Sequence, residues 1–568
     1  MKYHLLSLVF CALFVLGCSS TQTIEKENNP TARNAFQDIS GKQVAIDRSP
    51  PKLVVGIVVD QMRYDYLTRF AKRYQIDGFN RLMDKGFNAK NNHYNFVPTY
   101  TAPGHAAIYT GTSPVNNGII GNNWYDKKIK RSIYNASDEN VQPVGTASDD
   151  GKMSPRRLLS TTVTDELEIH TQGRAKVIGL SLKDRGAILP AGHAADGAFW
   201  FKGDDEGNFV SSTFYMDKLP SWVKEFNESS AAESYLKEWN TLYPIGTYTA
   251  SGPDNNNYEK GPQGKESPTF PYDLKELAER NGNFSILKST PYGNSLLTDL
   301  AILAIDAEEM GLDPITDFLT VSYSSTDYIG HQYGANSVEI EDTYLRLDQE
   351  IARLLQNLDR KVGKGNYTVF LTADHGAVHN PGFLEDMKIP AGYFDLQQLR
   401  SKLKARLVER YGDNDIIEEI SNNQIFLDKN ELSRLERSSR EIQEFISETI
   451  IEMEHIDKVF TRYALMNTNF DAGVGKLIQN GFNQQRSGDV VYHLSPAVIR
   501  YGRTGSTHGS AQSYDTHVPL LFYGKGIKKG ETYERTEIID IAPTISSLLG
   551  IPFPNAATGN PIPQVLDR

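Results

Sequence analysis

Short runs of apolar and β-branched residues recur along the chain, and polar side chains follow each run directly. Uninterrupted apolar runs of strand length are typical of strands that are buried on both faces of a parallel sheet. Segments of helical periodicity separate the runs, so the order strand, polar strand end, helix repeats. That order predicts an α/β fold with a doubly wound, mostly parallel central sheet flanked by helices. The strands are expected at residues 53–59, 177–180, 318–323 and 368–372.

Amphipathic stretches between these strands predict the helices that cover the sheet. Asn294 is expected to cap a helix over Ser295–Met310, because apolar residues recur there every three or four positions. The same spacing predicts a helix over Ile340–Leu358. Val518–Gly524 is expected to form a late strand, and Pro519 favours an edge position because proline cannot donate a ladder hydrogen bond.

Residues 51–568 are expected to form one domain, because the repeating pattern extends over most of this length. Two long segments interrupt the pattern, at about residues 195–290 and 393–493. The first is rich in Gly, Asn, Ser, Pro and aromatic residues, which favours loops around a core. The second contains helical stretches at 396–411 and 430–453. We interpret both segments as inserted cap or loop subdomains.

The N-terminal residues have the pattern of an export signal. Lys2 precedes an apolar run over Leu5–Leu16 that is too short to span a bilayer, so residues 1–17 are predicted to be a signal peptide. Cys18 follows as in a bacterial lipoprotein signal, and a plain secretory leader cut a few residues later is the alternative. Residues 18–50 are polar and predict a tether. We expect a protein of the periplasm or outer membrane, anchored by acyl chains on Cys18.

Composition and charge narrow the range of partners. The 568 residues carry a formal net charge of -12, with 39% hydrophobic and 23% charged residues, which is an ordinary globular composition. A net negative charge gives no general attraction to nucleic acid, so any phosphate must be bound by local groups. Cys11 and Cys18 are the two cysteines and lie in the leader region, so the mature chain is expected to contain no disulfide.

Six acidic and imidazole side chains stand at or near predicted strand ends, where ligands bind in open α/β sheets. Three Asp and three His divide into two sets of oxygen and nitrogen ligands, a mixture that suits Zn²⁺ with an open position on each ion. Asp327 and His331 are four residues apart, so on a helical turn they share a face. Taken singly, such residues are also common in caps and turns. The six are Asp60, Asp327, His331, Asp374, His375 and His508.

Four further residues suit the binding of an anion. Thr101 precedes a Pro-Gly turn near a predicted helix N-terminus, where free N–H groups favour anions. Lys183 and Arg185 follow a predicted strand, and in extended backbone residues two apart point to the same side. Two cations on one side suit a phosphate or a carboxylate. Asn122 lies in a turn-rich loop and is able to donate to a bound oxygen. Each residue also has a plainer interpretation as part of a turn or a solvated loop.

Collected in chain order, these residues resemble the alkaline phosphatase superfamily, and more closely the phosphate-irrepressible periplasmic alkaline phosphatases of the PafA type. The resemblance extends over nearly all of the mature chain. Each motif is weak alone, but their common order makes the match specific. The motifs are Val59-Asp60-Gln61-Met62-Arg63, Thr101-Ala102-Pro103-Gly104-His105, Gly121-Asn122-Asn123-Trp124, Lys183-Asp184-Arg185, Asp327-Tyr328-Ile329-Gly330-His331, Asp374-His375-Gly376 and Thr507-His508-Gly509.

The resemblance implies an alkaline-phosphatase-like fold, two Zn²⁺ ions per chain and a role for each site residue. The first zinc would be held by Asp327, His331 and His508. The second would be held by Asp60, Asp374 and His375, and would also contact the nucleophile, Thr101. The phosphoryl oxygens would be bound by Asn122, Lys183 and Arg185.

The implied reaction is hydrolysis of phosphate monoesters through a covalent phosphothreonine, because a Thr hydroxyl needs activation at neutral pH and a bound Zn²⁺ supplies it. Lys183 and Arg185 favour monoesters, whose dianionic phosphoryl group offers several free oxygens. A phosphodiesterase or nucleotide pyrophosphatase with the same metals is the nearest alternative. A non-catalytic lipoprotein that captures phosphate or zinc is the alternative from another class. Small-molecule esters are the expected partners, and the resemblance implies a monomer.

Neighbouring residues leave two assignments open. Thr99 also precedes the Pro-Gly turn, and Thr101 is preferred because the superfamily nucleophile stands two residues before that proline. His517 is the alternative to His508. These histidines near the motifs are expected to be structural or to support the ligand residues from outside the site, namely His105, His193, His379 and His517.

Overall fold

The computed structural model describes residues 35–37, 43–45, 49–412 and 415–567. The chain divides into two units, residues 1–49 and 50–568. In the first unit, strands β1 (Ala35–Gln37) and β2 (Gln43–Ala45) pair antiparallel. The predicted signal peptide and Cys18 lie outside the described residues.

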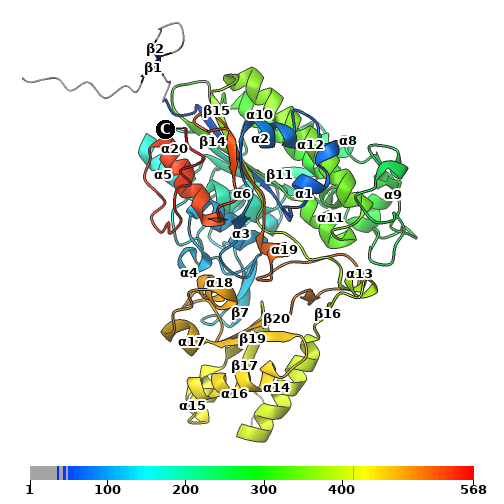
Figure 1. Cartoon of the computed structure of the whole chain (residues 1–568), viewed down its shortest axis with the longest axis vertical. Coiled ribbons are helices and arrows are strands. Elements are labelled where there is room, and N and C mark those ends of the chain that lie inside the picture. The colour runs from blue at the N-terminus through cyan, green and yellow to red at the C-terminus, as the bar shows by residue number, and fades with distance from the viewer. Residues whose placement is uncertain (1–34, 38–42, 46–48, 413–414, 568) are drawn as a thin grey trace, which may run out of the picture. The chain divides into compact units, whose positions relative to one another are not determined.

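A ten-stranded sheet runs through the second unit (Figure 1), in the order β23-β4-β22-β15-β3-β14-β9-β10-β11-β8. The five adjacent strands from β15 to β10 are parallel, and antiparallel pairs join them to the strands on either side. This confirms the predicted mostly parallel central sheet. The strands are β3 (Leu53–Val59), β4 (Phe87–Ala89), β8 (Pro143–Val144), β9 (Val177–Ser181), β10 (Gly197–Lys202), β11 (Asn208–Ser212), β14 (Asp317–Tyr323), β15 (Tyr367–Thr372), β22 (Leu520–Gly524) and β23 (Gly530–Thr532).

The middle strands form because their residues are apolar or β-branched and are buried on both faces. Every position of β3, β14 and β15 is buried. Their register aligns the carboxyl ends, since Val59 of β3 lies opposite Tyr323 of β14, and Val58 lies opposite Thr372 of β15. The residues that follow these three strands therefore start from the same edge of the sheet.

Helices cover both faces of the sheet (Figure 1). On one face, α3 (Thr101–Thr110) packs against α6 (Asp184–Ala191) and α20 (Ile541–Leu549). On the other face, α10 (Pro291–Ala307) packs against α12 (Val338–Leu358). The helix expected over 340–358 is confirmed with an earlier start. Among the described residues, none of the helices combines the length and apolar character that crossing a bilayer requires.

The predicted cap of α10 is wrong. The helix begins at Pro291, with Thr290 at the N-cap, so Asn294 lies inside it and the helix ends at Ala307. Proline is well suited to the first helical turn because its missing N–H has no intrahelical partner there. The Asn294 side chain instead accepts a hydrogen bond from the Ser325 N–H at 3.3 Å, across to the helix that follows β14.

Two expectations about the sheet are also corrected. Residues 197–212, expected to lie in an insertion, supply β10 and β11 of the central sheet. The late strand β22 lies between β4 and β15 rather than at an edge. Pro519 precedes this strand, and its carbonyl accepts a hydrogen bond from Thr372 Oγ1 at 2.7 Å. Proline therefore costs the ladder nothing at this position.

Residues 417–494 build a separate antiparallel sheet, in the order β17-β18-β20-β19, at the lower end of Figure 1. Helices α14 (Leu396–Tyr411) and α16 (Ser439–Ile451) pack on each other and share an apolar core with this sheet. The second predicted helix, 430–453, is two helices, α15 (Lys429–Arg434) and α16, because Ser438 caps α16 anew. The strands are β17 (Ile417–Ser421), β18 (Gln424–Leu427), β19 (Ile456–Thr461) and β20 (Val490–Leu494).

Candidate active site

The six predicted metal ligands come from the carboxyl edge of three neighbouring strands and from one late loop. Asp60 follows β3, and Asp374 and His375 follow β15. Helix α11 (Ser325–Tyr333), which follows β14, contains Asp327 and His331 on one face. His508 lies in the loop between β21 (Val498–Ile499) and α19 (Ser513–Thr516). The structure brings the six together as two groups of three.

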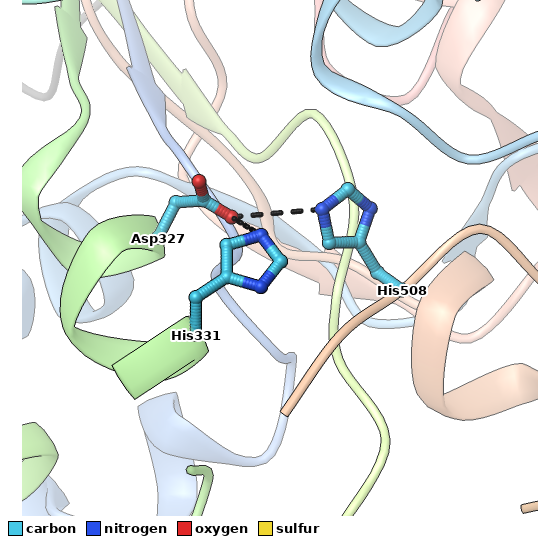
Figure 2. A group of neighbouring side chains, drawn as sticks. All are labelled: Asp327, His331 and His508. Atoms are coloured by element: carbon cyan, nitrogen blue, oxygen red, sulfur yellow. Dashed lines mark ion pairs between the residues drawn. The ribbon is translucent and has the colours of Figure 1, made fainter. Parts of the chain in front are cut away.

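The first group is Asp327, His331 and His508 (Figure 2). His331 Nε2 lies 3.2 Å from Asp327 Oδ1, and His508 Nε2 lies 3.6 Å from the same oxygen. The His331 side chain is 27% exposed and that of His508 is 6% exposed, so solvent reaches this group from the His331 side.

The second group is Asp60, Asp374 and His375, all fully buried. His375 Nε2 lies 3.4 Å from Asp60 Oδ1 and 3.6 Å from Asp374 Oδ2. These same three atoms have no hydrogen-bond partner among the described residues. Buried polar atoms are costly without partners, so three of them facing one another fit a bound cation.

Hydrogen bonds to backbone carbonyls orient all three imidazoles. Nδ1 lies 3.0 Å from the Gly376 carbonyl in His375, 2.8 Å from that of Ser506 in His331, and 2.7 Å from that of Thr99 in His508. A carbonyl accepts only from an N–H, so Nδ1 carries the proton in each ring. The lone pair of each Nε2 then faces its group, which is the arrangement typical of metal-binding histidines.

The electrostatics of the groups also suit a cation. Burial, reinforced by Asp60, raises the pKa of Asp374 well above its usual range, and burial lowers the pKa of His375 to about 3. Burial also lowers the pKa of His508 well below its usual range. Burial raises the pKa of Asp327, but His331 and Lys183 outweigh it and hold that pKa well below the usual range. Burial lowers the pKa of His331, but Asp327 outweighs it and raises that pKa. The site thus combines two imidazoles that burial keeps neutral, those of His375 and His508, with crowded carboxylates that need positive charge nearby.

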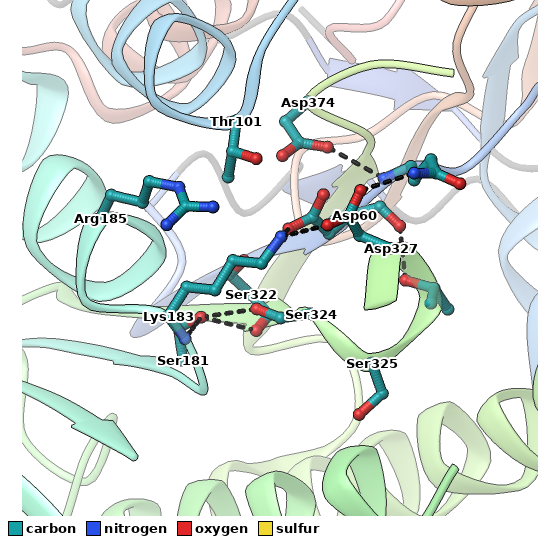
Figure 3. A network of polar contacts seen from close by, with 12 residues as sticks. Asp60, Thr101, Ser181, Lys183, Arg185, Ser322, Ser324, Ser325, Asp327 and Asp374 are labelled. Carbon is teal, nitrogen blue, oxygen red and sulfur yellow. Dashed lines mark hydrogen bonds and ion pairs between the residues drawn. The ribbon is translucent and has the colours of Figure 1, made fainter. Parts of the chain in front are cut away.

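Lys183 lies between the two groups (Figure 3). Its ammonium is 2.6 Å from Asp60 Oδ2 and 2.5 Å from Asp327 Oδ2. The expected extended backbone at Lys183-x-Arg185 is wrong, because Lys183 is the N-cap of α6 and Arg185 stands in its first turn. Both side chains nevertheless enter the site, since the start of α6 lies at the carboxyl end of β9.

Arg185 is held from behind and keeps a donor free. Its Nη1 donates to Tyr134 Oη at 3.1 Å, and Tyr134 in turn donates to Asp184. Its buried Nε has no hydrogen-bond partner among the described residues. A fixed guanidinium with an unused N–H fits an anionic oxygen.

Thr101 is the first residue of α3 and is 1% exposed. The expected Pro-Gly turn after it is wrong, because Pro103 and Gly104 continue the first turn of the helix. Figure 3 shows Thr101 between Arg185 and Asp374. The Asn122 side-chain oxygen accepts from the Ala102 N–H at 2.9 Å, which leaves the Asn122 amide nitrogen available beside the helix N-terminus.

Comparison with known proteins decides the family. The type I phosphodiesterase / nucleotide pyrophosphatase family matches residues 54–517. The chain belongs to this family. Alkaline phosphatase PafA from Elizabethkingia meningoseptica is 45% identical over 523 residues, covering 91% of this chain and 95% of that protein. Alkaline phosphatase PhoV from Synechococcus elongatus is 42% identical over 562 residues, covering 99% and 100%.

Two further proteins also match this chain over most of its length. A protein named calcium-transporting ATPase from Myroides odoratus is 46% identical over 527 residues, covering 91% of this chain and 95% of that protein. The crystal structure of wild-type PafA matches with a TM-score of 0.88 and 45% identity, covering 91% of this chain and 99% of that chain. The chain is therefore a close homologue of PafA within the alkaline phosphatase superfamily, and is an enzyme of the alkaline phosphatase type.

The residues considered as alternatives to Thr101 and His508 lie outside both groups of ligands. The Thr99 hydroxyl donates to the Ser510 carbonyl at 3.0 Å. His517 stacks between Tyr64 and His93, with centroid distances of 4.3 and 4.6 Å. His105 contacts the site from behind, because its Nδ1 lies 2.8 Å from the Thr101 carbonyl and 3.4 Å from Asp374 Oδ2. His193 bonds Asp165, and His379 packs near Phe383.

Gln61 is a site residue to which the sequence reasoning assigned no role. Its backbone N–H donates to Asp374 Oδ1 at 3.1 Å, and its side-chain amide donates to Asp327 Oδ1 at 2.6 Å. It thereby links a carboxylate of each group, with its backbone in the left-handed region at φ 63. Its position directly after Asp60 was the available signal, but only the fold shows which acids it meets.

Proposed function

We propose that the protein is a zinc-dependent alkaline phosphatase that hydrolyses phosphate monoesters through a phosphothreonine. The observation that supports this most strongly is the second group, where Asp60, Asp374 and His375 turn three buried, unpartnered atoms toward one another. Thr101 lies beside Asp374 in the same site, with Lys183 and Arg185 close by (Figure 3).

The ligand set fits two zinc ions better than hard cations such as Mg²⁺, because each group contains imidazole nitrogen as well as carboxylate oxygen. One ion would be held by Asp327, His331 and His508, and the other by Asp60, Asp374 and His375. When bound, the two ions would lower the pKa of the Thr101 hydroxyl and balance the charge on the departing oxygen.

The chain's own residues would then perform the following steps. Thr101 Oγ attacks phosphorus as the phosphorus–oxygen bond to the organic group breaks, and the alcohol leaves with a proton. Lys183, Arg185 and the Asn122 amide donate to the phosphoryl oxygens and stabilise their charge. Water then attacks the phosphothreonine, its phosphorus–oxygen bond to Thr101 breaks, and phosphate leaves with the threonine hydroxyl restored.

A solved variant of PafA supports the choice of these four residues. It replaces one threonine, one asparagine, one lysine and one arginine, and its structure matches this chain with a TM-score of 0.87 and 44% identity. In that variant the threonine and asparagine are 21 residues apart and the lysine and arginine are two apart, as are Thr101 and Asn122, and Lys183 and Arg185.

Replacing the nucleophile tests the proposal. Thr101→Ala should abolish phosphate release from an aryl phosphate, because no oxygen remains to attack phosphorus. Zinc content, measured by elemental analysis, should stay close to that of the unaltered protein, since each group keeps its three ligands. Thr99→Ala is the matched control and should retain activity. Unchanged turnover by Thr101→Ala would refute the nucleophile.

Hydrolysis of diesters is the second candidate, since the family name includes phosphodiesterases. Lys183 and Arg185 argue against it, because a diester has one fewer charged oxygen for them to bind. Turnover of an aryl phosphate compared with its methyl ester distinguishes the two. A higher kcat/KM for the methyl ester would overturn the monoesterase proposal.

We also propose that the protein is exported and lipid-anchored through Cys18. The short apolar run before Cys18 and the polar residues after it support this. Cys18→Ser should move phosphatase activity from the membrane fraction to the soluble extracytoplasmic fraction. An unchanged distribution would contradict the anchor.

We propose that small phosphate monoesters are the partners of this protein. We also propose that the protein is a monomer. The net charge of -12 offers nothing to attract nucleic acid. Sedimentation of the purified protein at the mass of one chain is the expected result, and a stable dimer would contradict it.

A further inference from the structure

Two hollows share Tyr328 in their lining, and one of them is also lined by two of the proposed phosphoryl-binding residues. The smaller, about 200 Å³, is lined by Lys183, Arg185 and Tyr328. The larger, about 420 Å³, is lined by Tyr328, His331 and Tyr501. The Lys183 ammonium lies 4.8 Å from the centre of the Tyr328 ring, so this phosphoryl-binding lysine is beside a residue that also lines the larger hollow.

The larger hollow also adjoins the solvent-facing side of the first group. His331 lines it and is the most exposed of that group's side chains at 27%. The organic part of a substrate bound at this group can extend into the hollow, whereas the second group is fully buried.

Tyr501 presents an aromatic face in this hollow. The residue is 43% exposed, and its ring lies 5.6 Å from the His331 ring, tilted by 31°. Its hydroxyl donates to the His331 carbonyl at 3.2 Å, which holds the ring in place. A large aromatic side chain that is fixed yet exposed provides a platform for another flat ring.

The segment 260–263 forms another part of the lining. The Lys260 N–H donates to the Gln332 carbonyl at 3.1 Å, which ties this segment to the end of α11. Lys260 and Gln263 line the hollow with polar groups. The hollow thus has one aromatic wall and one polar wall, which suits a ring that also carries polar substituents.

We propose that this hollow seats the organic group of the substrate, that Tyr501 determines specificity, and that ring-bearing phosphate monoesters are the preferred class. The inference rests on the proposed phosphatase function. Tyr501 acts by stacking on the substrate ring, so short alkyl esters, which leave its face bare, bind less well.

Benzyl phosphate and ethyl phosphate test the inference, because their alcohols have similar acidity and differ in the ring. The unaltered zinc-loaded enzyme should prefer benzyl phosphate by about two- to tenfold in kcat/KM, the range that one aromatic pair contributes. Tyr501→Ala should remove most of that preference, and Tyr501→Phe should keep it. Tyr463→Ala is the matched control and should also keep the preference for benzyl phosphate. Tyr463 is likewise 43% exposed but lies in α17 (Arg462–Asn467).

A second measurement needs no variant. Benzylphosphonate should inhibit the unaltered enzyme about two- to tenfold more strongly than ethylphosphonate, for the same stacking reason. Equal inhibition, equal turnover of the two esters, or a preference that survives Tyr501→Ala would overturn the inference while leaving the phosphatase intact. Absence of phosphate release from both esters would refute the proposed function, and the inference with it.

Discussion

Each imidazole in the two ligand groups is held by one backbone carbonyl, and this contact decides which ring nitrogen faces the group. The Nδ1 atoms of His331, His375 and His508 lie 2.7 to 3.0 Å from carbonyl oxygens. The Nε2 lone pairs are thereby directed without any acidic partner behind them. Under the zinc proposal, this geometry would favour a cation that binds nitrogen ligands.

The first prediction at the residue scale concerns the contribution of Lys183 to catalysis. Lys183→Ala should lower kcat/KM for a phosphate monoester by about 10²–10³, the usual loss when one preorganised donor is removed. The fall should be smaller for the methyl ester of the same phosphate, which has less charge to stabilise. Steady-state kinetics at saturating zinc measures both. Lys404→Ala, on the exposed side of α14, is the control, and a fall of less than tenfold in Lys183→Ala would make Lys183 peripheral.

The second prediction at the residue scale concerns Gly104, because α3 approaches Asp374 closely at this position. A Cβ at Gly104 would lie 2.4 Å from the Asp374 carbonyl oxygen and 2.8 Å from the Asp374 Cβ. Gly104→Ala should therefore shift Asp374, reduce zinc content and destabilise the fold by roughly 1–3 kcal/mol, although alanine favours helices.

Urea unfolding and elemental analysis check the Gly104 variant. The control is Gly246→Ala, where a Cβ would meet nothing within 4 Å. Equal zinc content and stability in Gly104→Ala would show that the helix and Asp374 can separate without cost.

At the scale of elements, the site is built where helices begin at the carboxyl edge of the sheet. Thr101 opens α3, Lys183 caps α6, and Asp327 stands in the first turn of α11. Free N–H groups and the helix dipole favour negative charge at such positions. Three helix starts at one edge therefore favour an anionic substrate before any side chain is counted.

Helix α5 (Val163–Thr171) makes a pH-dependent contribution to stability. Burial, with the nearby charges of Asp196 and Asp317, raises the pKa of Glu168 from 4.5 to about 8. The folded state thus holds the proton more tightly, so the stabilisation is complete below the unfolded pKa of 4.5 and is lost as the pH rises through about 8.

Glu168→Gln should remove this dependence, because glutamine stays neutral. The melting temperature of the variant should exceed that of the unaltered protein at pH 9, and the difference should shrink toward pH 5. Thermal unfolding at both pH values measures this. Glu225→Gln, at an exposed position of α7 (Ser221–Glu228), is the control. A pH-independent difference for Glu168→Gln would contradict the raised pKa.

For the whole molecule, metal binding should couple distant parts of the chain. The first group joins α11 to the loop that contains His508, and the second joins β3 to β15. A cation that binds only the folded arrangement stabilises it by mass action.

Removal of metal is the prediction at this scale. Dialysis against a chelator should abolish phosphate release and lower the melting temperature, and added Zn²⁺ should restore both. At each of the two sites, Zn²⁺ at about 100 times that site's Kd should add about 2.7 kcal/mol to the free energy of unfolding. Retained activity after verified loss of metal would refute the zinc proposal. Mg²⁺ is the control ion and should restore less, because it binds imidazole poorly.

Much of the sheet was predictable from local pattern. The uninterrupted apolar runs of β3, β14 and β15 and the polar residues after them are local features, and the parallel arrangement follows from the helices between them. Asp60, Asp374 and Asp327 therefore could be assigned to one edge before any contact was known. The His508 loop has no such pattern, and its place came from resemblance to a family.

The sequence alone determined which segments are buried strands, which residues stand at their ends and which ligand types are present, because these depend on neighbours within a few residues. Only the tertiary structure decided that β10 and β11 join the sheet, that Pro519 precedes an internal strand, and that α6 begins at Lys183. It also decided that Gln61 links the two groups. The reason is physical: strand pairing and hydrogen-bond partners join residues far apart in the chain, so local pattern does not contain them.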